Sequence, residues 1–333
     1  MKDAPPMSVV SRGTPLSEKF KGRLRLPIIS APMMRVSGPD LVIAACRAGV
    51  IGAFPTANAK SPEELDAWMK RITSEISEAP GICAPVCPNL IIRRASLAED
   101  LACLVRHKVE VVITSVGSPE AVVKPLHDVG CLVFADIASI RHAEKAIQAG
   151  ADGLILLTAG AGGNTGWANP FAFVRAVRKI FDGPLVLAGG VSDGQSLHAA
   201  QVLGCDLAYM GTRFIATTES MASDRYKSML VTSTLDDVML TKALTGPGLQ
   251  VNMLRPSLIA AGLDPERLDE QVSAERAKER FSGGSANAGN ERPKRWVDIW
   301  SAGHSVSAVD SITDVSTLVH RLEQEYASAR KVS

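Results

Sequence analysis

A short apolar run, a turn and then a helical pattern recur eight times between residue 24 and about residue 230. The runs are continuous in apolar residues and rich in Val, Ile or Leu, as is typical of strands buried on both faces of a parallel sheet. They are Leu26–Ser30, Val50–Phe54, Gly81–Val86, Val109–Ser115, Cys131–Ala135, Gly153–Thr158, Pro184–Ala188 and Asp206–Gly211. Eight such units predict a closed (β/α)8 TIM barrel, an α/β fold. A doubly wound sheet is the alternative, but no Gly-x-Gly-x-x-Gly turn follows the first run.

The segments between the runs have helical patterns. A serine precedes a proline at Ser61-Pro62 and again at Ser118-Pro119, which is typical of a helix start, and Gly150 is a typical helix stop. The expected helices are Gly38–Ala48, Ser61–Ile76, Ala121–Val129, Ile140–Ala149, Phe171–Phe181, Gly194–Leu203, Ser220–Val231 and Ser311–Ala329.

Residues 232–299 break this rhythm. Leu235–Leu244 and Pro265–Phe281 have helical patterns, and Ser282–Asn290 is a loop rich in Gly, Ser and Asn. The block is too short and polar for a core of its own, so we expect a helical cap over the barrel mouth, inserted after the eighth strand. The predicted organisation is a barrel of residues 1–231 and 300–333 with a cap segment of residues 232–299.

Composition limits the partners and the compartment. The chain has 36 Lys and Arg against 35 Asp and Glu, and this balance argues against a nucleic-acid or anionic-membrane partner. No stretch of about 20 apolar residues predicts a membrane span. Met1–Lys21 lacks the apolar centre of a secretory signal, so a cytoplasmic protein is expected. The six cysteines are expected to be core residues, and their spacing predicts no metal site.

Small residues gather where the predicted strands end, which is where barrel enzymes carry their chemistry. Gly189-Gly190 follows the seventh strand and Gly211-Thr212 the eighth. Backbone amides exposed by glycine bind phosphate oxygens, so these pairs predict a phosphate-bearing ligand, although either pair alone is also a common tight turn.

The loop after the sixth strand holds four glycines in seven positions, Gly160, Gly162, Gly163 and Gly166, and Trp167 follows. Such a loop lets backbone approach a flat ligand closely, and the alternative is a flexible loop without a ligand. A Walker-type phosphate loop is excluded because no Lys-Ser/Thr follows the glycines.

Several ordered motifs together resemble the nitronate monooxygenase (2-nitropropane dioxygenase) family of FMN-dependent barrels. They are Pro27–Met33 (PIISAPM), Ala149–Gly153 (AGADG), Ala161–Gly166 (AGGNTG), Leu187–Gly194 (LAGGVSDG), Met210–Phe214 (MGTRF) and Trp300–His304 (WSAGH).

The resemblance implies one FMN across the barrel mouth, with its phosphate at the two glycine pairs named above. Ala31, Pro32 and Met33 would lie against the isoalloxazine ring, and Asn89 would hydrogen-bond the ring or the ribityl chain. The predicted cofactor-binding set is Ala31, Pro32, Met33, Asn89, Ser115, Asp136, Gly162, Gly163, Ala188, Gly189, Gly190, Met210, Gly211 and Thr212. The family implies oxidation of alkyl nitronates with O2, and related branches reduce quinones or enoyl thioesters with NAD(P)H.

Three positions depart from the family pattern. Asn164 replaces the histidine of a Gly-Gly-His loop, and an amide cannot take a proton near neutral pH. Asn164 is therefore expected to orient an anionic nitronate, and neutral nitroalkanes are expected to be poor substrates. Asp136 stands where some relatives carry lysine. His304 stands where relatives commonly show glutamine, and it is a candidate acid or base or a mere loop residue.

We therefore predict an FMN-dependent oxidoreductase of the nitronate monooxygenase type, with Asn164 and His304 as candidate catalytic residues. The alternatives are an NAD(P)H-dependent quinone or enoyl reductase, a non-redox sugar-phosphate barrel enzyme and a non-catalytic FMN-binding protein. A small-molecule substrate with O2 or NAD(P)H as co-substrate is expected, and a homo-oligomer remains open.

Overall fold

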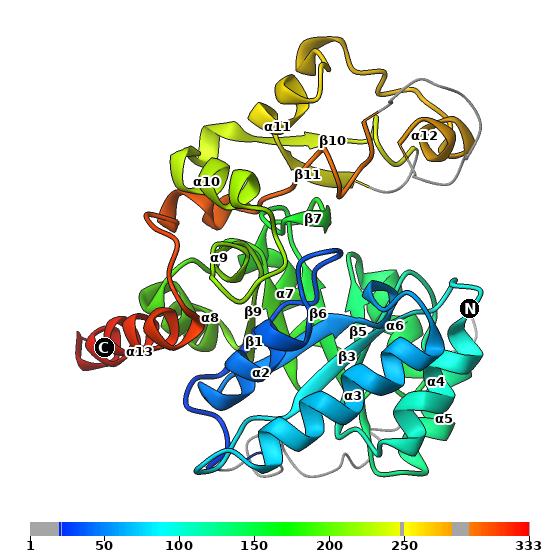
Figure 1. Cartoon of the computed structure of the whole chain (residues 1–333), viewed down its shortest axis with the longest axis vertical. Helices are drawn as coiled ribbons and strands as arrows, with labels where there is room; N and C mark the ends of the chain where they lie inside the picture. Colours follow the sequence, from blue (N-terminus) through cyan, green and yellow to red (C-terminus); the bar gives the residue numbers. More distant parts are fainter. Residues whose placement is uncertain (1–19, 21, 247–249, 282–292, 333) are drawn as a thin grey trace, which may run out of the picture.

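A closed barrel of eight parallel strands forms the centre of the computed structural model, as predicted (Figure 1). The structure describes residues 20, 22–246, 250–281 and 293–332. The barrel strands are β1 (Ile28–Ser30), β2 (Ile51–Pro55), β3 (Val86–Ile91), β4 (Val111–Ser115), β5 (Leu132–Ile137), β6 (Gly153–Leu157), β8 (Leu185–Ala188) and β9 (Leu207–Met210). The ring closes where β9 pairs with β1, with Ile29 opposite Tyr209.

Helices surround the barrel. They are α2 (Pro39–Arg47), α3 (Pro62–Ser77), α4 (Leu97–Arg106), α5 (Glu120–His127), α6 (Ile140–Gln148), α7 (Pro170–Arg178), α8 (Gly194–Leu203) and α13 (Val315–Val332). The Ser61 hydroxyl accepts a hydrogen bond from the Glu64 N–H and caps α3, as its pattern predicts. Helix α13 packs on α8 through Val315, Leu318 and Leu322, which are buried.

The barrel interior is filled by side chains rather than open. Residues that point inward from the strands form one buried cluster, among them Ile29, Ile51, Ile113, Phe134 and Ile155. The six cysteines are buried free thiols, as expected. Burial of such apolar surface is the main favourable contribution to folding, and it fixes the strand ends on which the site is built.

Two boundaries around the third strand were wrongly predicted. The run Gly81–Val86 precedes the strand, because the ladder to β2 begins only where Val86 pairs with Gly52. Asn89 therefore lies within β3 and not in the loop after it. Helix α4, which follows this strand, was not predicted.

The segment after the barrel contains helices and also strands. Leu235–Leu244 is not a helix, because its residues 235–237 form a 3-10 turn and Val238–Thr241 form β10. Strand β10 pairs with β11 (Gln250–Leu254), which in turn pairs with β7 (Gly163–Thr165) of the glycine-rich loop. The helices here are α9 (Thr212–Ile215), α10 (Asp224–Thr232), α11 (Arg255–Ala260) and α12 (Ala274–Phe281). We call residues 232–299 the cap, and Figure 1 shows it above the barrel mouth.

Pro265–Phe281 is helical only at its two ends, Pro265–Arg267 and Ala274–Phe281. The predicted loop Ser282–Asn290 lies outside the described residues, and so does most of the N-terminal stretch Met1–Lys21, of which only residue 20 is described.

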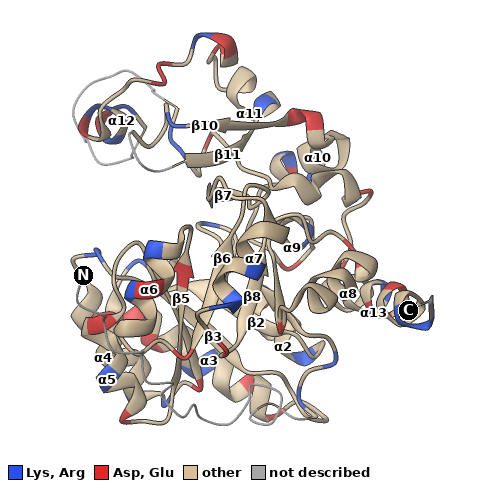
Figure 2. Ribbon diagram, turned by 180° about the vertical axis from the view of Figure 1, so that it is seen from behind, with Lys and Arg blue, Asp and Glu red and all other residues tan. Residues whose placement is uncertain are grey.

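Lys and Arg residues are interspersed with Asp and Glu residues along the ribbon in the view of Figure 2. Within the described part of the chain, no helix is both long enough and apolar enough to cross a membrane.

Candidate active site

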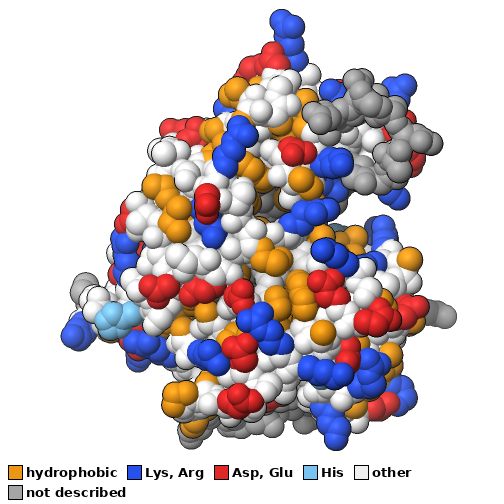
Figure 3. All heavy atoms as spheres, in the orientation of Figure 1, with side chains coloured by type: hydrophobic (Ala, Val, Ile, Leu, Met, Phe, Trp, Pro, Cys, Tyr) orange, Lys and Arg blue, Asp and Glu red, His pale blue; other side chains and the backbone are white. Residues whose placement is uncertain are grey.

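A pocket opens at the carboxyl ends of the barrel strands, under the cap. It encloses about 1240 Å³ of empty space, part of it open to solvent. Figure 3 shows a hollow between the cap and the barrel on one face of the molecule. All of the predicted site residues line the pocket except Met210 and His304.

The two predicted phosphate-binding pairs meet on one side of the pocket. Gly189 and Gly190 follow β8, and Gly211 and Thr212 follow β9. Both glycines after β8 have positive φ, and a Cβ on Gly190 would meet no atom within 4 Å, so the side-chain position of Gly190 faces open space. The Gly190 and Gly211 N–H groups have no acceptor among the described residues. These free donors fit an anionic group of a ligand.

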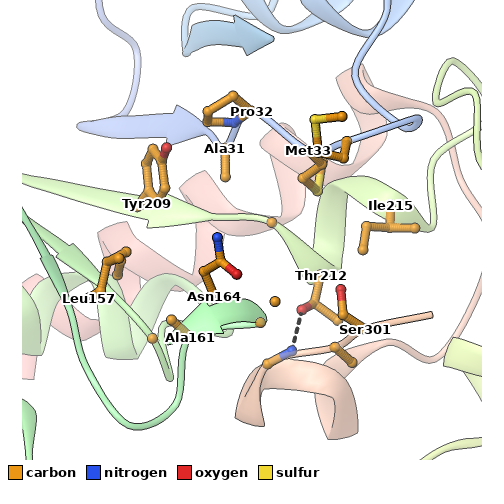
Figure 4. Close-up of a pocket in the computed structure, with 18 of the residues that line it drawn as sticks. Ala31, Pro32, Met33, Leu157, Ala161, Asn164, Tyr209, Thr212, Ile215 and Ser301 are labelled. Atoms are coloured by element: carbon orange, nitrogen blue, oxygen red, sulfur yellow. Dashed lines mark hydrogen bonds between the residues drawn. The ribbon is translucent and has the colours of Figure 1, made fainter. Parts of the chain in front are cut away.

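The glycine-rich loop forms the adjoining wall. A Cβ on Gly162 would lie 2.7 Å from the Gly303 nitrogen and 2.9 Å from the Ala302 carbonyl carbon, so only glycine permits this approach. Gly303 in turn donates its N–H to Thr212 Oγ1 over 2.9 Å (Figure 4). Segment Trp300–Gly303 therefore contacts both the glycine-rich loop, at Gly162, and the turn after β9, at Thr212.

The cap holds the same loop from above. The buried Asn252 amide on β11 donates hydrogen bonds to the Ala159 and Ala161 carbonyl oxygens, over 2.8 and 2.7 Å. Asn164 pairs with Val251 of β11. Figure 4 shows the Asn164 amide pointing into the pocket, toward the loop that contains Ala31. The strand pairing to the cap therefore positions this side chain.

The loop after β1 forms the opposite wall. Ser37 Oγ accepts from the Met33 N–H over 3.0 Å and donates to the Ala31 carbonyl over 3.2 Å. The Asn58 amide donates to the Met33 carbonyl oxygen over 2.9 Å. These bonds hold Ala31, Pro32 and Met33 as a rigid, mostly apolar surface.

Polar groups stand at three neighbouring strand ends. Asn89 and Ser115 exchange hydrogen bonds over 3.2 Å between β3 and β4. Asp136 follows on β5, and its Oδ1 is enclosed without a hydrogen-bond partner. Burial raises the pKa of Asp136 to about 7.

An aromatic wall was missed at the sequence level. Trp296, Trp300 and Tyr226 line the pocket, and the Tyr226 and Trp300 rings stack with centroids 5.0 Å apart. No local signal marks them as neighbours, because the two tryptophans stand seventy or more positions after Tyr226 in the chain. Tyr209 on β9 also lines the pocket (Figure 4).

Three singled-out residues lie outside the pocket lining. Met210 is buried behind it. The exposed His304 packs its ring beside Gly160, where a Cβ would lie 3.3 Å from the His304 Cγ. Trp167 is 76% exposed. The geometry therefore offers no support for a catalytic His304.

Asp66, Cys103 and His107 form a group of potential metal ligands, found among the described residues outside the pocket lining. The Asp66 carboxylate already contacts Lys70 and Arg106 as well as His107. Burial raises the pKa of the Cys103 thiol, which disfavours the thiolate that metals bind.

Comparison with known proteins identifies relatives over most of the chain. The family model described as nitronate monooxygenase matches residues 16–325. The (3aS,4S,5R,7aS)-5-hydroxy-7a-methyl-1-oxo-octahydro-1H-indene-4-carboxyl-CoA dehydrogenase of Mycobacterium tuberculosis is 27% identical over 285 residues, which are 84% of this chain and 74% of the relative. A nitronate monooxygenase of Paraburkholderia phytofirmans is 26% identical over 72% of this chain and 76% of its own.

Solved structures share the fold. FabK from Thermotoga maritima matches with a TM-score of 0.78 at 25% identity, over 93% of this chain and 95% of its own. Nitroalkane oxidase from Streptomyces ansochromogenes matches with a TM-score of 0.72 at 24% identity, over 93% and 98% of the two chains.

Proposed function

The chain belongs to the nitronate monooxygenase family, and from that premise we propose that it is an FMN-dependent oxidoreductase that oxidises alkyl nitronates, or a related small organic substrate, with O2. The matched relatives are oxidoreductases, and the family supports a flavin enzyme of this fold acting on a small molecule. The identity of the flavin, the substrate and the electron acceptor are the parts that we propose.

The observation that carries the proposal is a glycine cradle on one side of the pocket, which consists of Gly189, Gly190 and Gly211. Gly190 and Gly211 offer N–H donors for the phosphate of FMN, and Thr212 stands beside them. The rigid Ala31–Met33 surface suits one face of a flat ring. Asn89 offers an amide to the polar edge of that ring or to the ribityl chain.

Bound FMN would supply the redox chemistry, accepting electrons from the substrate and passing them to O2. The residues of this chain would bind and orient. Asn164 donates and accepts hydrogen bonds and would orient a nitronate, which is already an anion. The cap and segment Trp300–Gly303 would limit the access of water to this space.

An NAD(P)H-dependent quinone or enoyl reductase of the same fold is the second candidate. It is favoured by the aromatic wall of Tyr226, Trp296 and Trp300, which offers apolar surface for a larger acceptor than a small nitronate. A sugar-phosphate barrel enzyme is disfavoured because, among the described residues, no lysine lines the pocket.

An absorbance spectrum of the purified protein is the first test, followed by anaerobic addition of propyl-1-nitronate or NADPH in separate cuvettes. Flavin bands that bleach with the nitronate would support the proposal. Bleaching with NADPH alone would favour the reductase. The absence of flavin bands, even after addition of FMN, would refute the flavin proposal and favour the sugar-phosphate enzyme.

Substitution of Asn164 tests its orienting role. Asn164→His restores the Gly-Gly-His pattern and places an imidazole in the pocket. We expect the variant to turn over neutral nitroalkanes faster than the wild type, measured as O2 consumption. A variant that binds flavin but is no faster would contradict the role assigned to this position.

A further inference from the structure

One pocket residue can change its charge near neutral pH. Among the described residues that line the pocket, Asp136 is the only carboxyl, and no His, Cys, Lys or Arg joins it. The other ionisable lining residues are Tyr209 and Tyr226. Burial raises the pKa of Tyr226 to about 12 and that of Tyr209 well above its usual value. Among the described lining residues, Asp136 is therefore the group suited to exchange protons with a ligand at neutral pH.

The surroundings of Asp136 leave it available to a ligand. Its Oδ1 is enclosed and has no hydrogen-bond partner, while the side chain borders the pocket. The adjoining strands β4 (VVITS) and β6 (GLILL) contribute no ionisable side chain. Burial, and to a smaller extent the charge of Asp136, raises the pKa values of Tyr209 on β9 and Cys87 on β3. Both are neutral at pH 7, and no described Lys or Arg lines the pocket to compensate the carboxylate.

We propose that Asp136 is the catalytic acid–base residue of this site, and that its carboxylate removes a proton from the carbon next to the electron-withdrawing group of a neutral substrate. This inference rests on the proposed function. In the step, a C–H bond of a neutral nitroalkane breaks and an O–H bond forms on Asp136. The electron pair of the C–H bond stays on the substrate, which becomes the nitronate, and no oxidant is consumed.

Charge balance supports this assignment. Together, a neutral nitroalkane and ionised Asp136 carry one negative charge. After the transfer, the nitronate and protonated Asp136 together carry the same charge. A nitronate that enters beside ionised Asp136 would place two negative charges in a pocket lined by no described Lys or Arg. Like charges in a site of low polarity repel strongly. Asp136 therefore selects for neutral substrates above its pKa and accepts anions below it.

This changes the expectation that follows from Asn164 alone. An amide at position 164 cannot take a proton near neutral pH. The carboxylate of Asp136, on β5, can take one. Asn164 then keeps the role of orienting the anion as it forms.

Hydrogen exchange tests the proton step without any redox turnover. Nitroethane is incubated anaerobically with the flavin-loaded protein in D2O, and loss of its α-hydrogens is followed by NMR. We expect the wild type to accelerate exchange over buffer and Asp136→Asn to lose the acceleration by about a hundredfold or more, the typical contribution of a general base. Asp136→Glu should restore part of it. Asp182→Asn, at an exposed position outside the pocket lining, should exchange like the wild type.

Two further arms separate this inference from the proposed function. With pre-formed ethyl nitronate, kcat/KM of the wild type should fall about tenfold between pH 6 and pH 8. The reason is that the protonated fraction of Asp136, with a pKa of about 7, falls about tenfold over this range. Asp136→Asn should show no such fall. Failure of the wild type to oxidise nitronate would refute the proposed function alone. Equal exchange by the wild type and Asp136→Asn, or no exchange by the wild type, would overturn the role of Asp136.

Discussion

Replacing Asp136 by Asn should stabilise the protein increasingly as the pH rises from 5 to 8. Burial raises the pKa of this carboxyl to about 7, whereas an unfolded chain leaves it near ~3.9. Between these values the unfolded chain is ionised and the folded protein holds the proton, so the wild type loses stability as the pH rises. The loss begins near the unfolded pKa and ends once the pH has passed the folded pKa.

The magnitude follows from the two pKa values. Each unit of difference corresponds to ~1.36 kcal/mol, so the full effect is about 4 kcal/mol as an upper limit. About 2 to 3 kcal/mol of it falls between pH 5 and pH 8. Asn has nearly the shape of Asp and does not ionise, so the difference between the two proteins isolates this one group.

Urea unfolding of the flavin-free protein at several pH values is the measurement, because bound cofactor would add its own binding energy. Asp182→Asn reports the effect of removing a solvent-exposed carboxylate. A stability difference between Asp136→Asn and wild type that stays constant within about 0.5 kcal/mol across this pH range would refute the reasoning.

Three substitutions test how the site is held together. Gly162→Ala forces a methyl group against the backbone at Gly303 and should weaken FMN binding at least tenfold in a fluorescence titration. Unchanged affinity would show that the two segments separate freely. Asn252→Ala leaves two loop carbonyl oxygens without their donor and should lower the free energy of unfolding, measured in urea, by about 2–4 kcal/mol. A loss below about 0.5 kcal/mol would mean that water replaces the amide. Thr212→Val removes the oxygen that accepts the hydrogen bond from the Gly303 N–H. We expect about tenfold weaker FMN binding with little change in circular dichroism. Equal affinity would contradict a role for this bond in closing the pocket.

The barrel and most of its mouth could be predicted because both depend on local signals. Apolar runs mark buried strands, and small residues directly after them mark the ends where a ligand approaches. Asn89 was placed in the site by the family resemblance, and it lines the pocket although the boundary of its strand was misplaced. Helix α4 was missed although Ser96 and Glu99 stand at the spacing of a capping box, and in the structure the Ser96 side chain makes no capping hydrogen bond.

The cap could not be predicted in the same way because its structure is set by distant partners. Val238–Thr241 has a pattern that a helix would also satisfy, and it becomes a strand only because Gln250–Leu254 lies beside it. That second strand then pairs with Gly163–Thr165, which turns part of a glycine loop into a sheet. Residue 164 is therefore oriented by a segment more than eighty positions away, and no local pattern contains that information.

The same dependence bears on specificity. The barrel supplies the glycine cradle, the Ala31–Met33 surface and Asp136, whereas the cap strand orients Asn164, and Trp296 at the end of the cap faces the same space. Chemistry that depends on the strand ends can therefore persist while substitutions in the cap change which substrate is accepted. Changes at Asp136 should alter proton transfer and its pH dependence for any substrate. Changes at Trp296 should alter the choice among substrates and leave that pH dependence in place.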